Sequence, residues 1–247
     1  MSVNLNVYVN LICHNECYLL PHAIQHYKKY LPSCVITIYD NESDDNSVEI
    51  AKAAGCNVVS WSSGGILDEF KMTHLRNNCW KNITDGWIIM ADMDEFVCIT
   101  EKELMEETKK GVTILRIQGA CMITDDDVNA ELTNVDLQKL KIYEKCVNES
   151  KNLCFKRSDI TDMNYGLGAH SCNPTGNIKY SEKVYFNKHM SPICLNYFVA
   201  KYQRRFTRSH DMRAQGIAIH YLNSLDEITK KYNYIRTLAK YTLQDDE

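Results

Sequence analysis

The sequence lacks any apolar stretch close to the roughly 20 residues that a helix needs to cross a bilayer. Its first residues, 1–7, carry neither a basic segment nor a long apolar segment, so they do not resemble a secretory signal. These two absences predict a cytoplasmic protein with no transmembrane segment.

Closely spaced cysteine pairs are also missing. The chain has 11 cysteines, an odd number, and no Cys-x-x-Cys pair. A zinc cluster uses such pairs, and the nearest approach to one is Cys13 and Cys17 with His14. Several cysteines lie in apolar runs, where a thiol behaves as a small hydrophobic group. We therefore expect reduced thiols in an intracellular protein rather than a zinc site.

An excess of positive charge is absent as well. The sequence has 28 Lys+Arg against 32 Asp+Glu, a net charge of −4, which argues against a dedicated nucleic-acid binder. No repeat, low-complexity segment or linker interrupts it, and its hydrophobic fraction of 45% is enough for a sizeable core. Residues 1–247 are expected to form a single domain.

The first half of the sequence alternates strand and helix signals. Apolar runs and capped segments predict a strand at 7–12, a helix at 20–30, a strand at 35–39, a helix ending at 54, a strand at 57–60, a helix at 67–81 and a strand from 87. A capping box at Thr100 and Glu103 begins a further helix. This order predicts an α/β fold with a mostly parallel sheet and helices on both faces.

The second half is less regular. Residues 112–117 and 153–156 resemble strands, and the three aspartates at 125–127 predict a solvated turn rather than a calcium site. A second capping box at Ser224 and Glu227 opens the final helix.

One helix of this half combines an apolar face with basic residues. The apolar positions follow helical spacing at Leu195, Phe198, Val199, Tyr202 and Phe206. The basic residues around them are Lys201, Arg204, Arg205, Arg208 and Arg213. They form either a solvated face or a contact for a phosphate or an anionic acceptor.

The strongest chemical signal is an acidic cluster after a buried run. The apolar residues 87–91 lead directly into Asp92, Asp94 and Glu95. Burying a bare carboxylate is costly, so acids at a strand tip need a cation, a hydrogen-bond donor or water. If the backbone stays extended, Asp92 and Asp94 point the same way and can share one ion. Oxygen ligands favour Mg²⁺, Mn²⁺ or Ca²⁺, whereas the alternative is a solvated turn.

Polar segments follow two other predicted strands, at residues 13–16 and 40–45. Right-handed crossovers place the carboxyl ends of parallel strands on one side of the sheet. Ligands of open α/β sheets bind in the crevice beyond those ends. We therefore expect residues 13–16, 40–45 and 92–95 to meet in one crevice.

These segments, in this order, resemble the family 2 glycosyltransferases of GT-A fold, in the branch with a DxDEF-type acidic motif. The segments that carry the resemblance are Ile12-Cys13-His14-Asn15-Glu16, Leu19-Leu20-Pro21, Ile38-Tyr39-Asp40-Asn41-Glu42-Ser43-Asp44-Asp45, Asp92-Met93-Asp94-Glu95-Phe96 and Gly216-Ile217-Ala218-Ile219-His220-Tyr221.

The resemblance implies a Rossmann-like, mostly parallel sheet flanked by helices. Residues 1–110 would be the nucleotide-sugar-binding half, and residues 111–247 a more irregular acceptor half with C-terminal helices. The implied reaction moves a sugar from a nucleoside-diphosphate sugar, with a UDP-sugar favoured, to a hydroxyl of a glycan, protein or lipid-linked acceptor. It would be non-processive, inverting and dependent on Mn²⁺ or Mg²⁺.

The resemblance also implies roles for individual acids. The residue matching Asp40 accepts from the nucleobase, and the one matching Asp92 faces the ribose or the metal. The residue matching Asp94 is the firmer metal ligand. Asn15 and Glu16 would line the nucleotide pocket.

Three further residues are candidates with open alternatives. Arg76 either reaches the pyrophosphate or is a surface arginine. His189 either completes the metal site or is an exposed histidine. His170 lies in a loop with two glycines and a proline, where it either acts on the acceptor as a catalytic residue or forms a structural hydrogen bond. His220 is a packed histidine in the simplest interpretation.

The chain also departs from the family. Many members carry a glutamate-aspartate pair that supplies the catalytic base, and no clear equivalent is present. Processive members have a QxxRW motif, but Gln203-Arg204-Arg205-Phe206 lacks the tryptophan.

Two other classes compete. A phosphohydrolase of the haloacid dehalogenase type also has a DxD after a strand, but it prefers Thr or Val where Phe96 stands. A catalytically inactive module that only binds nucleotide or sugar is the second rival.

Overall fold

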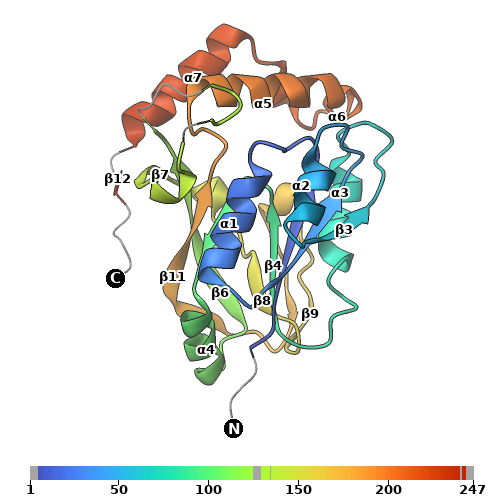
Figure 1. Cartoon of the computed structure of the whole chain (residues 1–247), viewed down its shortest axis with the longest axis vertical. Coiled ribbons are helices and arrows are strands. Elements are labelled where there is room, and N and C mark those ends of the chain that lie inside the picture. The colour runs from blue at the N-terminus through green and yellow to red at the C-terminus, as the bar shows by residue number, and fades with distance from the viewer. Residues whose placement is uncertain (1–4, 125–128, 134, 240, 243–247) are drawn as a thin grey trace.

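A computed structural model describes residues 5–124, 129–133, 135–239 and 241–242 (Figure 1). The acidic turn expected at 125–127 lies outside these residues. The fold is mixed α/β, with a curled central sheet flanked by helices, as the sequence predicts.

The first half forms the parallel part of the sheet. Its elements are β1 (Val7–Cys13), α1 (Leu20–Tyr30), β2 (Val35–Asp40), α2 (Ser47–Ala53), β3 (Asn57–Ser60), α3 (Glu69–Asn78) and β4 (Trp87–Asp92). The strands lie side by side in the order β3-β2-β1-β4, and each neighbouring pair is parallel. The predicted strand and helix order is therefore confirmed, although α3 is shorter than expected.

The remaining strands extend the sheet with mixed directions. They are β5 (Glu95–Cys98), β6 (Ile114–Met122), β7 (Ile142–Cys146), β8 (Cys154–Lys156) and β11 (Tyr180–His189), with α4 (Glu101–Lys109) between β5 and β6. A separate small ladder joins β9 (Ile160–Asp162) to β10 (Thr175–Gly176). Strand β8 is antiparallel to β4, whereas β11 runs parallel to β6 and antiparallel to β5. The β11–β5 pairing brings residues of the second half beside the acidic motif.

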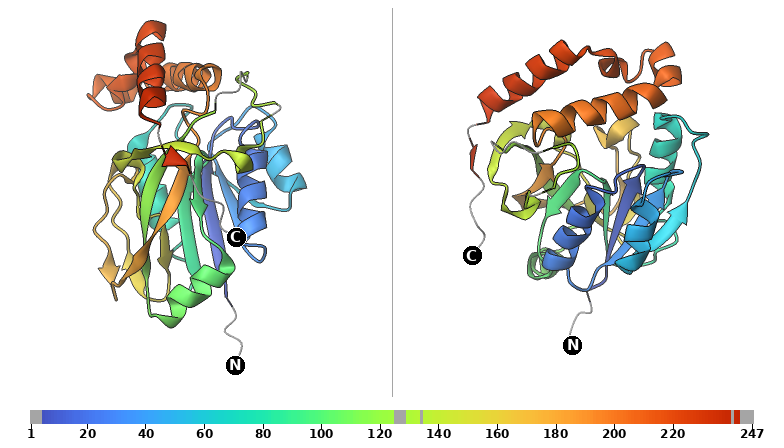
Figure 2. Two further views of the ribbon diagram at one scale, coloured as in Figure 1. Left: turned by 90° about the vertical axis from the view of Figure 1, so that its left-hand side faces the viewer. Right: turned by 45° about the horizontal axis from the view of Figure 1, so that its top comes forward.

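Helices of the second half cover the carboxyl ends of the parallel strands. This layer contains α5 (Leu195–Arg208), α6 (His210–Ala214), the 3₁₀ turn η4 (Ile219–Leu222) and α7 (Leu225–Leu238), followed by β12 (Tyr241–Thr242). Figure 2 shows α5 and α7 lying across the top of the sheet. The backbone N–H of Leu67 donates to the carbonyl of Arg208 at 2.8 Å, which ties the end of α5 to the loop after β3.

The apolar run of β4 is continuous because both faces of the strand are buried. Trp87, Ile89 and Ala91 join the hydrophobic cluster under α1, while Ile88 and Met90 join the cluster on the other face. Strands buried on both faces lose the alternation typical of half-exposed strands. Gly86, at φ +114°, permits the close approach of the chain to Asn6 just before β4.

Capping boxes begin two helices where the sequence predicts them. In α4 and α7 the cap hydroxyl and the glutamate three residues later bond reciprocally, at Thr100 with Glu103 and at Ser224 with Glu227. Each box satisfies backbone N–H groups that have no partner within the helix.

Candidate functional site

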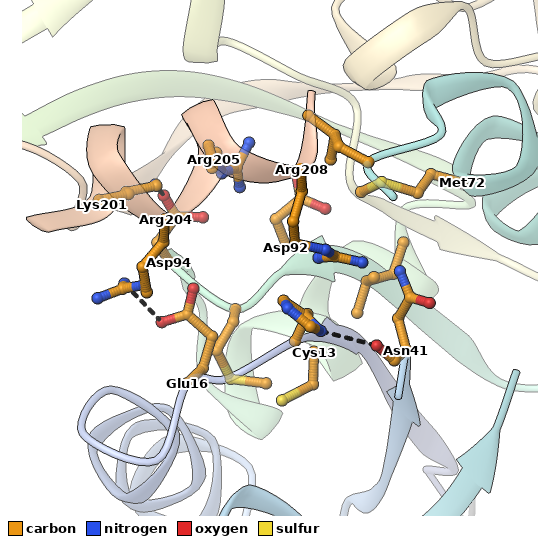
Figure 3. Close-up of a pocket in the computed structure, with 14 residues that line it drawn as sticks. Cys13, Glu16, Asn41, Met72, Asp92, Asp94, Lys201, Arg204, Arg205 and Arg208 are labelled. Carbon is orange, nitrogen blue, oxygen red and sulfur yellow. Dashed lines mark hydrogen bonds and ion pairs between the residues drawn. The ribbon is translucent and has the colours of Figure 1, made fainter. Parts of the chain in front are cut away.

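The three polar segments meet at one crevice, as expected. A small cavity at the carboxyl ends of β1, β2 and β4 is lined by Cys13, His14, Glu16, Asn41, Asp92, Met93 and Asp94. Its opposite wall is α5, which contributes Lys201, Arg204, Arg205 and Arg208 (Figure 3). Acids on the strand tips therefore face a row of bases on one helix.

The backbone of the acidic motif is not extended. Asp92 ends β4, residues 93–94 form a turn, and Glu95 begins β5. The backbone N–H of Asp92 donates to Glu95 Oε2 at 2.8 Å across this turn. The extended geometry assumed from the sequence was wrong, because the chain reverses here to bury Phe96 and Val97.

Asp92 is held by Arg76. Arg76 Nη2 donates to Asp92 Oδ1 at 2.6 Å, while Arg76 Nη1 lies 3.8 Å from Glu69 Oε2. Burial alone raises the pKa of Asp92, but Arg76 and Lys151 outweigh it and hold that pKa at about 2. Arg76 is only 2% exposed, so it is not a surface arginine. It orients Asp92, and a direct contact with pyrophosphate stays a prediction.

Asp94 meets two basic side chains from the second half. Its Oδ2 lies 3.1 Å from His189 Nε2 and also contacts the ammonium of Lys201 on α5. Burial disfavours the ionised Asp94, but Lys201 and His189 hold its pKa well below the usual range. Burial also disfavours charged His189, yet Glu149 and Asp94 raise its pKa above the ordinary value. His189 is therefore not an exposed histidine, since only 15% of its side chain is accessible.

These contacts fit a divalent ion only in part. Two ligands bound at right angles to one ion at about 2.1 Å lie about 3 Å apart, which matches the separation of Asp94 and His189. Within the described ranges, however, no three His, Cys, Asp or Glu side chains converge as ligands. Asp92 shares a cavity with the other two but is committed to Arg76 through one oxygen. An ion on Asp94 and His189 would have to take its remaining ligands from a substrate or water.

A buried network of ion pairs joins Lys151 to Glu95, beside the acidic turn, and to Glu149. Lys151 Nζ lies 2.7 Å from Glu95 Oε1 and 3.2 Å from Glu149 Oε2. Burial opposes the charge on Lys151, but the carboxylates of Glu95 and Asp92 raise its pKa. Sequence reasoning missed Lys151 and Glu149, because nothing local indicates that this lysine pairs with Glu95 of β5.

The predicted nucleotide-contacting residues differ in their surroundings. Asp40 is 4% exposed and is not among the side chains that line the small cavity. Its Oδ1 has no hydrogen-bond partner among the residues that the structure describes. Glu16 lines the small cavity, where Arg204 Nη2 lies 3.9 Å from it and burial raises its pKa. Asn15 instead turns to Asp44, donating from Nδ2 to Oδ1 at 2.6 Å from a left-handed backbone, φ 52°. Asn15 thus ties the loop after β1 to the loop after β2.

A second cavity, of about 520 Å³, adjoins the first and shares Asp92, Asp94, Lys201 and Arg205 with it. Aromatic side chains of the helical layer line its outer part, namely Phe198, Tyr202, His220, Tyr221 and Tyr234. His220 packs against Tyr221 with ring centroids 4.0 Å apart, and burial lowers the pKa of His220 to about 4.

His170 and Glu144 also line this second cavity. His170 Nδ1 lies 2.8 Å from the carbonyl of Asn148, so Nδ1 donates to it, and in the neutral ring Nε2 is an acceptor. Gly168, at φ +63°, leaves room for the His170 ring, since a Cβ there would lie 2.7 Å from it. Burial raises the pKa of Glu144. Both side chains are therefore able to take a proton from a ligand in this cavity.

The helix α5 places its bases by helical periodicity. Residues 201, 204, 205 and 208 lie on one side of the helix, and all four line the small cavity. Arg205 donates to the Tyr221 hydroxyl at 2.8 Å and Arg208 to the Ile66 carbonyl at 3.0 Å. The sequence showed this basic face, and the tertiary structure turns part of it inward.

Comparisons with known proteins found similarity to solved structures only. No protein-family model and no curated protein matches the chain. Among solved structures it is similar to S. aureus TarS residues 1–349 in complex with UDP, at 11% identity and TM-score 0.46, covering 83% of this chain and 65% of that one. It is also similar to glucosyl-3-phosphoglycerate synthase from Mycobacterium tuberculosis in complex with Mn²⁺, UDP and glucosyl-3-phosphoglycerate, at 15% identity and TM-score 0.33, covering 47% and 44%. The chain thus spans less than two thirds of the length of either structure.

Among the described residues, no helix combines the length and the apolar character that a bilayer crossing requires.

Proposed function

We propose that this chain is a glycosyltransferase that moves a sugar from a nucleoside-diphosphate sugar to an acceptor hydroxyl. The observation that carries the proposal is the small cavity at the strand tips, where Asp92 and Asp94 face the bases of α5. The negative charge of a diphosphate complements the basic side chains that α5 contributes to this cavity. The larger adjoining cavity gives an acceptor access to the same point.

The bases of α5 are proposed to bind the diphosphate. Arg204, Arg205 and Arg208 each present a planar fork of donors that matches phosphate oxygens. Charge grows on the leaving nucleoside diphosphate as the glycosidic bond breaks. Fixed cations in a largely buried site stabilise that charge without reorganising.

Asp94 and His189 are proposed to hold Mn²⁺ or Mg²⁺, with Asp92 as a further ligand or a contact to the ribose. Such an ion would supply neutralisation of the diphosphate oxygens. The 3.1 Å between Asp94 and His189 supports the pair as adjacent ligands. Arg76 would then act by orienting Asp92.

On the nucleotide side, Asp40 is proposed to accept a hydrogen bond from the base, because its Oδ1 lacks a partner. Glu16 would line the pocket directly. Asn15 would shape it through the loop that it ties to Asp44. A UDP-sugar is the favoured donor.

Residues 111–247 are proposed to supply the acceptor side. An inverting transfer needs one general base and no covalent intermediate. His170 is proposed as that base through its Nε2, and Glu144 is the other side chain of the cavity suited to the role. The proposed acceptor is a glycan, a protein or a lipid-linked molecule.

A thermal-shift panel tests the proposal. UDP-, GDP- and dTDP-sugars are each added with and without Mn²⁺, because a ligand that binds only the native state must raise its melting temperature. We expect one nucleotide series to stabilise the chain, followed by release of its nucleoside diphosphate when an acceptor is present. Absence of any shift with every donor would reject the proposal.

The two rival classes predict different results. A dehalogenase-type phosphohydrolase needs a free aspartate nucleophile, whereas Asp92 is engaged by Arg76 at 2.6 Å. Phosphatase turnover without nucleotide-sugar would favour that class. Donor binding with neither hydrolysis nor transfer would indicate an inactive binding module.

A further inference from the structure

We propose that Lys201 is an internal counter-ion of Asp94 that gives way to a divalent ion and moves onto the diphosphate when nucleotide binds. The inference rests on the proposed function and assigns one more residue to the same site. It concerns how the metal and the nucleotide are coupled.

The first observation is that Lys201 and a metal would require the same atom. Lys201 is 6% exposed, and its ammonium contacts Oδ2 of Asp94, the oxygen that also lies 3.1 Å from His189. An ion bound to that oxygen would lie close to the ammonium, because both would contact the same atom. Two cations so close would repel each other, so binding of the ion requires Lys201 to leave.

The second observation is that a single contact holds Lys201 in place among the described residues. In the part of the chain that the structure describes, Asp94 is its single hydrogen-bond and ion-pair partner. Arg205 and Arg208 on the same helix are each anchored to a protein oxygen. A lysine also carries a point charge on a flexible stem, which suits a cation that must change partners.

The third observation is that Lys201 lies beside the cavity proposed for the diphosphate. Lys201 lines both cavities, and residues 204, 205 and 208 of the same helix face the small one. When a diphosphate occupies that cavity, its oxygens would offer Lys201 a new partner. Without nucleotide, displaced Lys201 would be a largely buried charge with none, which is costly.

Coupled binding follows. A metal ion alone must displace Lys201 with no compensation, so it binds weakly. Nucleoside diphosphate removes that penalty, so the ion and the nucleotide each raise the affinity of the other by the same factor. Lys201 is thus a positioning residue before donor binding and a phosphate contact afterwards.

The test measures binding of Mn²⁺ alone, of UDP alone and of each in the presence of the other, by titration calorimetry on the full chain. Wild type is expected to bind Mn²⁺ weakly when UDP is absent. With UDP present, its affinity for Mn²⁺ should be at least about tenfold higher. Lys201→Met should bind Mn²⁺ alone about tenfold more tightly than wild type, and its coupling to UDP should fall by a similar factor. Lys230→Met, an exposed lysine of α7 paired with Asp226, is the matched control and should match wild type.

Lys201→Gln provides a second variant if Lys201→Met folds poorly. Lys201 variants that bind Mn²⁺ alone no more tightly than wild type overturn the proposal, as does unchanged coupling. If wild type binds UDP and Mn²⁺ independently, the exchange is wrong while the transferase assignment stands. If wild type and the control bind neither UDP nor any other nucleotide of the thermal-shift panel, the proposed function itself fails.

Discussion

The Nε2 of His189 lies 3.1 Å from Oδ2 of Asp94, which joins the last residue of β11 to the turn after β4. The contact follows from strand pairing, because His189 is in register with Glu95 of β5 and Cys121 of β6. It places a nitrogen donor of the second half beside a carboxylate of the first half. The site is therefore assembled from both halves of the chain.

Asp94→Asn should abolish the Mn²⁺-dependent part of stabilisation by UDP, because the amide removes the charge that would hold the ion. Asn is the informative substitution, since Ala would leave Lys201 largely buried without a partner at a cost of several kcal/mol. Thermal shift with UDP, with and without Mn²⁺, measures the effect. Full turnover of wild type in saturating EDTA would contradict the role of the ion.

Asp40→Asn should weaken nucleoside-diphosphate binding by about 1–3 kcal/mol, because it alters the pairing of a buried polar group without changing its size. Titration calorimetry with UDP measures the change. Glu49→Gln, a carboxylate on α2 outside both cavities, serves as the control. Wild-type affinity in Asp40→Asn would show that Asp40 does not contact the base.

Arg76→Met should lower the free energy of unfolding by about 3 kcal/mol, because it removes the cation that is hydrogen-bonded to Asp92. Urea denaturation measures the loss. The double variant Arg76→Met with Asp92→Asn should recover most of the stability, since the uncompensated charge is then gone. A single variant as stable as wild type would mean that the pair is not maintained in solution.

Stability should fall as the pH drops from about 6.5 towards 4, and His26 should be a major cause. Burial lowers the pKa of His26 to about 4, and its Nε2 lies 2.9 Å from the Val97 carbonyl. The folded pKa is below the unfolded one, so the contribution is complete above the unfolded value and is lost as the pH falls through the folded value. The full loss is about 3 kcal/mol.

The variant His26→Gln isolates the contribution of His26 to the pH dependence of stability. Its free energy of unfolding should depend less on pH over the same range, while His220, whose pKa burial also lowers to about 4, keeps its own share. Urea denaturation at pH 7, 6 and 5 measures both slopes. An unchanged slope in His26→Gln would show that His26 titrates normally.

His170→Ala should reduce transfer by about 100-fold or more while leaving UDP affinity unchanged, since a general base acts on the acceptor and not on the donor. The measurement compares release of UDP with binding of UDP. Glu144→Gln is the companion variant, because Glu144 lines the same cavity. A larger loss in Glu144→Gln than in His170→Ala would assign the base to Glu144 instead.

Local patterns predicted the framework of the fold well. The helix at 20–30 coincides with α1, and both capping boxes begin helices. The shortfall includes β5, β7 and β11, for which the sequence analysis predicts no strand. Strand β11 is stabilised by pairing with β6 on one side and β5 on the other, and such long-range pairing leaves little trace in local composition.

Local patterns were enough to predict the strand-helix order and the acidic motif at the end of a buried strand, because periodicity, caps and apolar runs act between residues close in the chain. The pairing of the charges depends on the tertiary structure. Arg76 pairs with Asp92, whereas Lys201 and His189 pair with Asp94. The partners lie on different helices and strands, and burial forces each carboxylate to find a cation wherever the fold brings one within reach.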